Sequence, residues 1–516
     1  MRTSFVDMMR LPQGQARSGI SRRAFLGGGA GVALAGVLGS SLPAGAATSV
    51  HPTSLLSPKP LLGPNPQQRA ALDILGRETL RLPGSVPFPA LLPGTDTMPG
   101  IEHIVVVMLE NHSFDNILGM LGRGDGWPLG RNGLPTSTNP YADGRLQHAF
   151  HMPTTCQLPS QPSQEWRTSN LAFNNGLMDG FVRSPLSPQL AGDVGGVAMG
   201  YWDSKDLPFT YGLASVFPIA NRWFQSMLGQ TDPNRRFLVA GTSSGMTDDI
   251  STTPTLDNLI QDALLATPTP TIFDVLTAFN ISWTDYIVSF PLGASSELDP
   301  VFDTGLTLVD KKPYAQFFTD AAAGKLPSFC IVEPDYDNTS QENPQNIVLG
   351  EAMLAEVVKA IGDSPAWERT LLVFTYDEHG GYYDHVPPPV ALAPDLLAPI
   401  VAVGESTYEG FERFGFRVPG VLVSAFAKKD YVSDVVFDHT SVLALVQRKW
   451  NLPALTLRDA NANDLTDLLD LGALKDGSPT FPSLPKLPAA DNTAAALKCS
   501  VTGPGVIPPP NSITAA

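Results

Sequence analysis

Cysteine is scarce in this sequence, with three residues among 516. Cys156, Cys330 and Cys499 lie far apart, which excludes a zinc finger and a CxxC redox motif. An odd number leaves at least one free thiol, so one disulfide bond is possible in an oxidising compartment. The spacing does not say which two cysteines would form it. The apolar residues around Cys330 predict a buried side chain there.

Basic residues are also few, with 33 Lys and Arg against 50 Asp and Glu, a net charge of −17. The chain has no basic patch and no phosphate-binding P-loop, so we predict that nucleic acid is not a partner. Charged residues make up only 16% and hydrophobic residues 43% of the chain, which indicates a large buried core. The length alone would allow roughly two to four domains.

The N-terminal 46 residues resemble a twin-arginine export signal. Arg22 and Arg23 precede Phe25 and Leu26, and a Gly/Ala-rich stretch then ends in a small-residue cleavage site after Ala46. We therefore predict that the twin-arginine export machinery is a partner. The mature chain would be exported to the periplasm, the cell envelope or the medium. The alternative is an uncleaved membrane anchor, for which residues 24–42 are only marginally long enough.

The rest of the chain divides by composition into three segments. Residues 47–96, rich in Pro, Leu and Gly, predict an extended N-terminal arm. Residues 97–455 predict the main folded domain, and residues 456–516 predict a Pro/Ala-rich wrapper or tail. Within the main domain, residues 122–230 contain many Gly, Asn, Ser and Pro and predict long loops over the active face.

Apolar runs and helical spacings alternate along the main domain. Strands are predicted at 101–109, 281–288, 328–332, 370–375 and 419–423. Helices are predicted at 67–80, 114–121, 271–279, 346–361 and 440–450, with another that begins at about Pro233, capped by Asp232. This alternation predicts an α/β fold in which a mainly parallel sheet is sandwiched between helices.

The segment TYDEHGGYYDHVPPP, residues 375–389, follows the apolar run at 370–374. Asp377 and Glu378 emerge where a buried parallel strand would end, which is the edge at which α/β sheets bind ligands. Two carboxylates beside His379 and His385 are suited to a hard divalent cation. The alternative is a solvated acidic turn, but the paired glycines indicate a tight, specific loop.

Other reactive groups also stand at predicted strand and helix ends. Glu110 and Asn111 follow the first strand, and Asp438 with His439 precedes the last helix. In a parallel sheet all these ends can face one edge, where oxygen ligands from two strands would surround one divalent metal ion.

Thr231 is the candidate nucleophile. It lies just before a predicted helix, where the field of the helix N-terminus favours negative charge. That field alone contributes about 0.3–1 kcal/mol at an exposed site, so a metal ion would have to supply most of the activation. The alternative is a capping hydroxyl without chemistry.

Four segments together resemble the signature blocks of the bacterial phosphoesterase family of phosphocholine-type phospholipases C and secreted acid phosphatases. They are VVVMLENHSFDNILGML, GQTDPNRRF, TYDEHGGYYDHVPPP and FDHTSVL. The resemblance spans roughly residues 101–452. It implies an alkaline-phosphatase-like fold and hydrolysis of phosphate esters through a metal-bound Ser or Thr, here with a phosphothreonine intermediate. A phospholipid substrate would imply transient contact with a membrane surface.

The resemblance also implies roles for individual residues. One divalent metal would be held by Glu110, Asn111, Thr231, Asp377 and Glu378. Thr231 would be the nucleophile, Asn111 would lie near the phosphoryl oxygens, and His439 would orient or protonate. Gln164, Asn343, His379 and Asp438 would contact the substrate. For His379 and His385 the alternative is a hydrogen bond that shapes the loop, and we expect His103 and His112 to be structural or surface residues.

Two departures from the family pattern bear on activity. Gln164 and Asn343 stand where relatives often carry histidines. Both side chains can donate hydrogen bonds to phosphate oxygens, but neither can supply a proton, and general acid catalysis is typically worth about 10²–10⁴-fold. The alternatives to a phospholipase C are therefore an acid phosphatase acting on phosphomonoesters and a catalytically weak metal-binding envelope protein. A sulfatase would need Cys or Ser in place of Thr231.

Overall fold

The computed structural model describes residues 63–157, 162–183, 193–249, 270–288, 311–343, 345–401, 404–491 and 499. The predicted export signal lies outside these residues. Among them, no helix combines the length and the hydropathy that a membrane crossing requires.

An eight-stranded sheet forms the centre of the fold, in the order β12-β6-β11-β10-β1-β9-β7-β8. The bounds of its strands are β1 His103–Leu109, β6 Ile219–Trp223, β7 Trp283–Ile287, β8 Lys311–Pro313, β9 Phe329–Val332, β10 Thr370–Tyr376, β11 Gly420–Ser424 and β12 Val432–Phe437. Two small sheets pair β2 (Thr138–Pro140) with β3 (Leu146–His148) and β4 (Phe150–His151) with β5 (Gly200–Tyr201).

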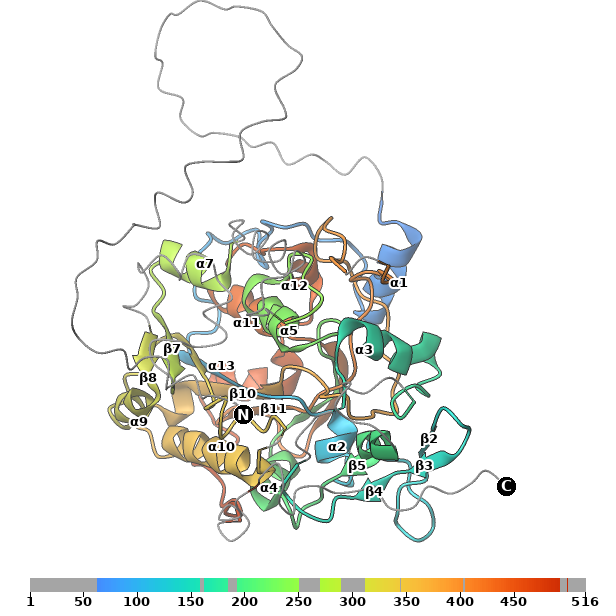
Figure 1. Ribbon diagram of the computed structural model, residues 1–516. Coiled ribbons are helices and arrows are strands. Elements are labelled where there is room, and N and C mark those ends of the chain that lie inside the picture. Colours follow the sequence, from blue (N-terminus) through green and yellow to red (C-terminus); the bar gives the residue numbers. More distant parts are fainter. Residues whose placement is uncertain are drawn as a thin grey trace, which may run out of the picture. The chain divides into compact units, whose positions relative to one another are not determined.

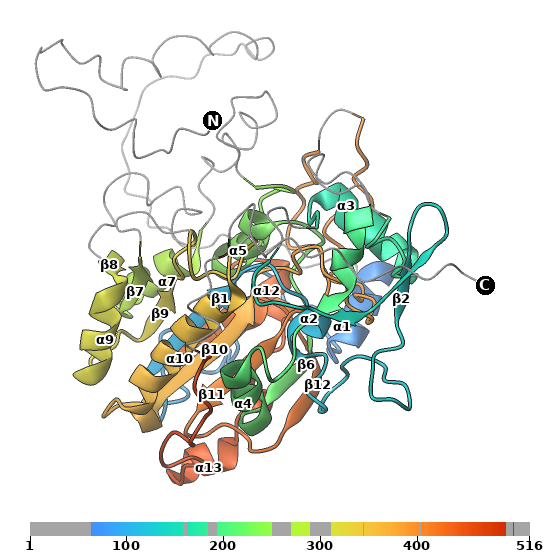
Figure 2. The ribbon, with the colours of Figure 1, turned by 60° about the horizontal axis from the view of Figure 1, so that its bottom comes forward.

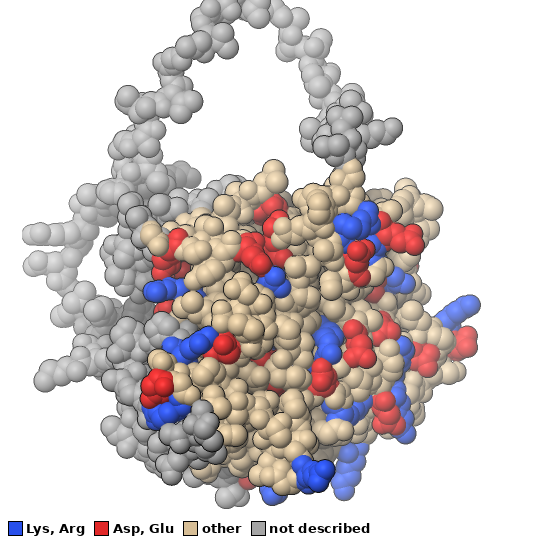
Figure 3. Space-filling model, turned by 90° about the vertical axis from the view of Figure 1, so that its right-hand side faces the viewer, with Lys and Arg blue, Asp and Glu red and all other residues tan. Residues whose placement is uncertain are grey.

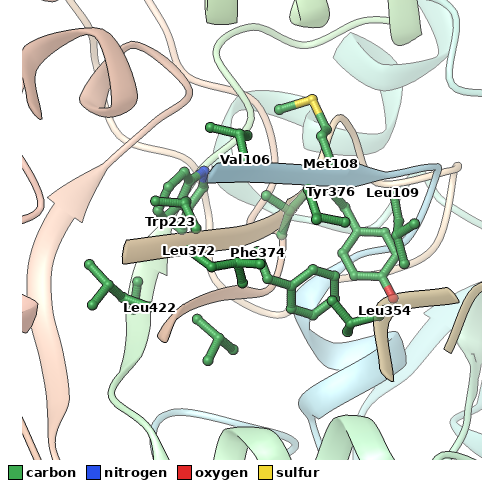
Figure 4. Close-up of a cluster of buried hydrophobic side chains, with 14 of the residues drawn as sticks. Val106, Met108, Leu109, Trp223, Leu354, Leu372, Phe374, Tyr376 and Leu422 are labelled. Atoms are coloured by element: carbon green, nitrogen blue, oxygen red, sulfur yellow. The ribbon is translucent and has the colours of Figure 1, made fainter. Parts of the chain in front are cut away.

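Strands β1 and β10 are the central pair, and every residue of both is buried. Such continuous apolar runs are typical of parallel strands covered on both faces. The two strands pair in parallel from His103 opposite Thr370 to Leu109 opposite Tyr376. Figure 4 shows side chains of both strands packed with Leu354, Trp223 and Leu422 from other elements. This register ends both strands at the same level of the sheet.

The predicted mainly parallel sheet is confirmed, with one exception. Strand β11 runs antiparallel to both of its neighbours, β10 and β6. All other pairings in this sheet are parallel. Because β11 is antiparallel to both β10 and β6, β6 runs in the same direction as β10. Strand β12 is parallel to β6 and so shares that direction.

Helices cover both faces of the sheet (Figures 1 and 2). On one face α10 packs against α9 and α4, and on the other α11 packs against α5 and α12. The helix bounds are α1 Pro66–Ile74, α2 Phe114–Leu118, α3 Trp166–Phe173, α4 Pro208–Val216, α5 Thr231–Ala240, α7 Ile272–Ala278, α9 Tyr314–Ala322, α10 Ile347–Gly362, α11 Thr440–Trp450, α12 Leu457–Asn461 and α13 Leu471–Asp476.

Two details of the predicted secondary structure are wrong. Residues 122–230 are not only loops, because they include α3, α4 and the sheet strand β6. Strand β6 was not predicted because Asn and Arg interrupt the apolar pattern of its sequence, IANRW. Helix α5 begins at Thr231 with Gln230 as N-cap, not at Pro233. Proline is tolerated in a first helical turn, so Pro233 marks the start only to within two residues.

The described residues beyond 455 pack against the main body. Beyond residue 455 the chain forms α12 and α13, and Leu484 and Leu487 then pack on the core. Cys499 forms a disulfide bond with Cys156, 343 residues earlier. Cys330 is a free, buried thiol in β9, as predicted. The predicted segment boundaries at 96 and 455 stay predictions, since α12 already belongs to the packed body.

Glu351 provides a test of how α10 holds α4. Its buried carboxyl group accepts the backbone N–H of Thr210, 2.8 Å away, in the first turn of α4. Burial raises the pKa of Glu351 to about 7 from an ordinary value of 4.5. The folded state therefore holds this proton more tightly than the unfolded state, and ionisation reduces stability as the pH rises through this window.

We predict that the free energy of unfolding of Glu351→Gln, relative to that of the parent protein, increases by about 2–3 kcal/mol when the pH is raised from 5 to 8. Urea unfolding at the two pH values measures this difference. Glu356→Gln, on the exposed side of the same helix, is the matched control. An equal pH dependence in both variants would contradict the assignment.

Candidate active site

The ends of β1 and β10 bring the first four candidate side chains together. Because Leu109 and Tyr376 are paired, Glu110 and Asp377 follow side by side. The backbone N–H of Asn111 donates to Asp377 Oδ1 at 3.0 Å, and that of Glu378 donates to the same oxygen at 2.7 Å. Asn111 adopts a left-handed backbone with φ of 69°. This turn folds the chain back over the end of β10.

Gly380 allows the close approach between the two loops. Its φ is +64°, and a Cβ atom there would lie 1.8 Å from the carbonyl oxygen of Asn111. No other residue fits this position without moving the backbone. The paired glycines of the sequence motif therefore serve to bring the Asn111 and Glu378 loops into contact.

Thr231 is the first residue of α5 and lies beside these strand ends. Its hydroxyl Oγ1 donates to Asn111 Oδ1 at 3.2 Å. The same hydroxyl is a hydrogen-bond partner of the Asp377 carboxylate. The N-terminus of α5, which is the positive end of the helix dipole, thus faces the strand edge.

Arg235 lies one turn further along α5 and was not foreseen as a site residue. Its fully buried guanidinium group contacts three carboxylates, those of Glu110 at 3.3 Å, Glu333 at 3.3 Å and Asp377 at 3.2 Å. It also donates to the carbonyl oxygen of Met108 in β1. The i, i+4 spacing from Thr231 within the QTDPNRRF block is the signal that could have revealed it.

Asp249 is another site residue that was not predicted from the sequence. Its Oδ1 accepts the backbone N–H of Asp232 at 2.8 Å, and its own N–H donates to the side chain of Gln230. It therefore satisfies the first turn of α5 directly next to Thr231. Burial, together with the nearby Asp232, raises the pKa of Asp249 well above its usual value.

The carboxylates of this edge are crowded and buried. Burial raises the pKa of Glu110 and of Glu378 well above the usual range, and Asp377 adds to both shifts. Glu378 Oε2 accepts the N–H of Gly380 at 2.7 Å. Arg235 supplies one positive charge against the carboxylates of Glu110, Glu333, Asp377, Glu378 and Asp249. The site therefore carries surplus negative charge when these groups are ionised.

His439 lies behind the strand edge. Its Nε2 donates to the backbone carbonyl oxygen of Asp377 at 2.6 Å, and its Nδ1 accepts from the indole of Trp223 at 3.4 Å. Burial lowers its pKa to about 3. A neutral ring with both nitrogens engaged is suited to positioning Asp377 rather than to delivering a proton.

Asp438 is directed to structural partners. Its carboxylate accepts from Ser226 and Thr440 at 2.9 and 2.6 Å and lies 3.5 Å from Arg458. These contacts join α11, α12 and the segment before α5. Its predicted contact with substrate has no support in this arrangement.

Of the other predicted substrate contacts, Asn343 is partly buried and Gln164 and His379 are buried. Asn343 Oδ1 accepts the hydroxyl of Tyr382 at 3.3 Å, and Gln164 is buried just before α3. The ring of His379 packs against Phe416 and Phe181, with Nδ1 3.0 Å from Glu378. Burial lowers the pKa of His379 to about 3, so this ring is neutral at pH 7.

His385 takes part in a separate ion-pair network. Asp115, Asp384 and His385 form one of two groups of metal-type ligands among the described residues; the other is His151 with Asp203 and Asp206. Arg417 pairs with Asp384 at 2.8 Å and with Asp115 at 3.2 Å, which gives the first group its counter-charge. The hydrogen bond from His385 to Asp115 agrees with the loop-shaping alternative.

The four signature segments, which are far apart in the sequence, therefore lie close together in the structure. The profile of the Phosphoesterase family matches residues 101–453 of this chain. The chain belongs to the phosphoesterase family. As a member it is a hydrolase acting on phosphoester bonds.

Named relatives of this phosphoesterase come from plants and bacteria. It is 30% identical to non-specific phospholipase C6 of Arabidopsis thaliana, over 72% of each chain. It is 28% identical to phospholipase C B of Mycobacterium tuberculosis strain H37Rv, over 77% of this chain and 84% of the relative. Non-hemolytic phospholipase C of Burkholderia pseudomallei is 29% identical, over 76% of this chain and 61% of the relative.

Solved structures give a more distant likeness. A protein of the alkaline phosphatase superfamily from Vibrio parahaemolyticus matches with a TM-score of 0.35 and 9% identity, over 77% of this chain and 78% of that one. Lipoteichoic acid synthase LtaP from Listeria monocytogenes matches with a TM-score of 0.33 and 9% identity, over 76% and 81%. Because these TM-scores are low, the α/β class is confirmed by the strand pairing instead.

We predict that Arg235→Met lowers the free energy of unfolding by roughly 3–5 kcal/mol, because it leaves buried carboxylates without their counter-charge. Urea unfolding at pH 7 measures the loss. Arg369→Met is the matched control, since Arg369 pairs with Glu102 at 2.8 Å on the surface, where a pair contributes at most about 1 kcal/mol. Equal losses in the two variants would show that Arg235 has no special role.

Proposed function

We propose that this phosphoesterase is exported, depends on one divalent metal ion and cleaves phospholipid headgroups in the manner of a phospholipase C, with Thr231 as nucleophile. One observation carries the proposal. The Thr231 hydroxyl, at the N-terminus of α5, lies 3.2 Å from the Asn111 carboxamide at the carboxylate-rich ends of β1 and β10.

The residues at this edge fit a hard divalent cation. Glu110, Asn111, Thr231, Asp377 and Glu378 offer oxygen donors only, which is the ligand type that such ions prefer. The carboxylates outnumber the positive charge that Arg235 brings to them, so a cation would relieve their mutual repulsion. When bound, the ion would polarise the phosphoryl group and lower the pKa of a neighbouring hydroxyl.

The chain's own residues supply position and charge. Thr231 Oγ1 forms a bond to phosphorus while the bond to the leaving alcohol oxygen breaks, and water then cleaves the phosphothreonine. The carboxylate of Asp377 lies within hydrogen-bonding reach of the Thr231 hydroxyl and offers an acceptor for its proton. The N-terminus of α5 favours the phosphate charge beside Thr231. His439 and Arg235 hold Asp377 in place.

The substrate class follows from the relatives, which carry phospholipase C names. Phosphomonoesters are the second candidate substrate class. The presence of Gln164 and Asn343 favours this class. Neither side chain can protonate a leaving alkoxide. Esters with good leaving groups, such as aryl phosphates, would therefore suit this site better than alkyl esters.

Export is supported by the covalent chemistry of the chain. The Cys156–Cys499 disulfide is typical of proteins that mature in an oxidising compartment. The Arg22–Arg23 signal in the sequence indicates the twin-arginine route. A location in the periplasm, the cell envelope or the medium is compatible with both the disulfide bond and the export signal.

We predict that Thr231→Ala lowers turnover of p-nitrophenyl phosphorylcholine by ~10³-fold or more, since removing a nucleophile removes the covalent route. Thr231→Ser keeps the hydroxyl and should retain measurable turnover. Circular dichroism and urea unfolding check that both variants fold like the parent protein.

Near-normal rates for Thr231→Ala would exclude Thr231 as nucleophile. Failure of the parent protein to hydrolyse either this diester or p-nitrophenyl phosphate, with metal shown to be bound, would favour the metal-binding envelope protein.

A further inference from the structure

The feature that stands out beyond the candidate catalytic residues is a covalent bond and not a surface patch. On the face drawn in Figure 3, Lys and Arg are scattered among Asp and Glu, so the coloured part of that face presents charges of both signs. The Cys156–Cys499 disulfide, in contrast, joins residues 343 positions apart and lies directly before Gln157. Because Cys156 and Gln157 are both buried, the bond reaches the interior next to a polar side chain.

Backbone contacts join the segment beside the disulfide to the start of α10. Cys156 pairs with Asn346 in an isolated antiparallel bridge. The carbonyl oxygen of Thr155 accepts the N–H of Ile347 at 3.0 Å. Residues 155–157 belong to no helix and no named strand. Their position therefore depends on such single contacts and on the disulfide bond.

The side chain of Gln157 extends this connection toward the candidate site. Its Nε2 donates to the carbonyl oxygen of Gln341 at 2.5 Å, and its Oε1 accepts from the hydroxyl of Tyr382 at 3.2 Å. The same hydroxyl lies 3.3 Å from Oδ1 of Asn343. One side chain thus binds both the loop that contains Gln341 and Asn343 and the loop that follows Glu378.

Gln341 has a backbone conformation that needs support from its neighbours. Its φ is 77°, in the left-handed region that residues other than glycine seldom adopt. Its side chain accepts from the hydroxyl of Tyr376 at 2.5 Å and donates to the carbonyl oxygen of Ile347 at 2.7 Å. Nε2 of His112 donates to its carbonyl oxygen at 3.0 Å, beside the bond from Gln157. The conformation of Gln341 therefore depends on the hydrogen bonds around it.

The next contact reaches a residue of the proposed metal site. The backbone N–H of Glu110 donates to the carbonyl oxygen of Ser340 at 2.8 Å. Since Ser340 and Gln341 share a peptide bond, a shift of the Gln341 backbone displaces the acceptor that holds Glu110. The buried contacts therefore run from the disulfide to the candidate site through Cys156, Gln157, Gln341, Ser340 and Glu110.

We propose that Gln157 is a positioning residue for the reaction and that the Cys156–Cys499 disulfide holds it in place, so that full turnover requires the oxidised chain. Without the bond, Gln157 no longer fixes the Gln341 backbone, and the contact of Ser340 with Glu110 loosens. A displacement of about 1 Å can lower a catalytic rate by about 10²-fold. The inference rests on the proposed function, because the site that the bond completes is the one around Thr231.

Closing the bond is a two-electron oxidation. Cys156 and Cys499 lose their S–H bonds and form one S–S bond, while the S–S bond of an external disulfide breaks and its sulfur atoms take up the two protons and two electrons. A reduced dithiol reverses the step. Because thiols stay reduced in the cytosol, a chain exported as proposed leaves the cytosol without this bond and gains full turnover only outside it.

The test removes the bond and the side chain separately. Cys156→Ser/Cys499→Ser lacks the disulfide, and Gln157→Leu keeps it but loses both hydrogen bonds of the side chain. A combined variant carries all three substitutions. Cys330→Ala is the matched control, since it removes the free, buried thiol and leaves the disulfide intact. Turnover is measured with p-nitrophenyl phosphorylcholine and p-nitrophenyl phosphate at saturating metal ion, and circular dichroism checks the fold.

We expect the disulfide variant and Gln157→Leu to fold, because the central sheet and its helices do not include residues 155–157. Each should lower kcat by ~10-fold or more at saturating substrate, where weaker substrate binding alone has no effect. The combined variant should lose no more than either, because both changes act through the same contacts. Hydrogen–deuterium exchange should become faster in peptides that contain Glu110 and Gln341. Cys330→Ala should stay within about twofold of the parent rate.

Three results would overturn the inference. They are unchanged turnover or unchanged exchange in either variant, additive losses in the combined variant, and an equal loss in Cys330→Ala. Failure of the disulfide variant to fold would also contradict it, since the bond would then support the whole fold and not the site. A parent protein that hydrolyses neither ester refutes the proposed function, and the exchange measurements then still decide whether the disulfide orders the backbone at Gln341.

Discussion

The ion pairs of Arg235 are the interaction on which the candidate site depends. Three buried carboxylates, from the ends of β1, β9 and β10, meet one guanidinium group from α5. Breaking such a pair leaves an uncompensated buried charge, which is among the most costly changes in a protein. Because Arg235 and Thr231 share one helix, the same ion pairs that partly compensate the charge at the strand ends also fix the hydroxyl beside Asn111.

A single guanidinium group does not balance this edge of the sheet. Glu378 and Asp249 add carboxylates to those that Arg235 contacts, and burial raises the pKa of both. Without a further cation, some of these groups would have to keep their protons at neutral pH. In the proposed function a divalent ion occupies this region, next to a hydroxyl at a helix N-terminus.

Much of this arrangement could be predicted from the sequence, because local pattern and chemistry coincide there. Strands β1 and β10 are uninterrupted apolar runs, and Glu110, Asn111, Asp377 and Glu378 follow them directly. What could not be predicted depends on contacts across the fold. Arg235 and Asp249 have roles only because α5 meets β1 and β10, and the reversed direction of β11 has no local signal. His439 stands in a signature block, yet its ring nitrogens bind Trp223 and the backbone of Asp377.

The central claim is that one divalent cation binds among Glu110, Asn111, Thr231, Asp377 and Glu378. The most direct measurement is anomalous diffraction from crystals of the purified protein grown with Mn²⁺. The account predicts one strong peak within about 2.0–2.6 Å of oxygen atoms from these residues. A peak confined to Asp115, Asp384 and His385, or no peak near Thr231 at saturating Mn²⁺, would contradict it.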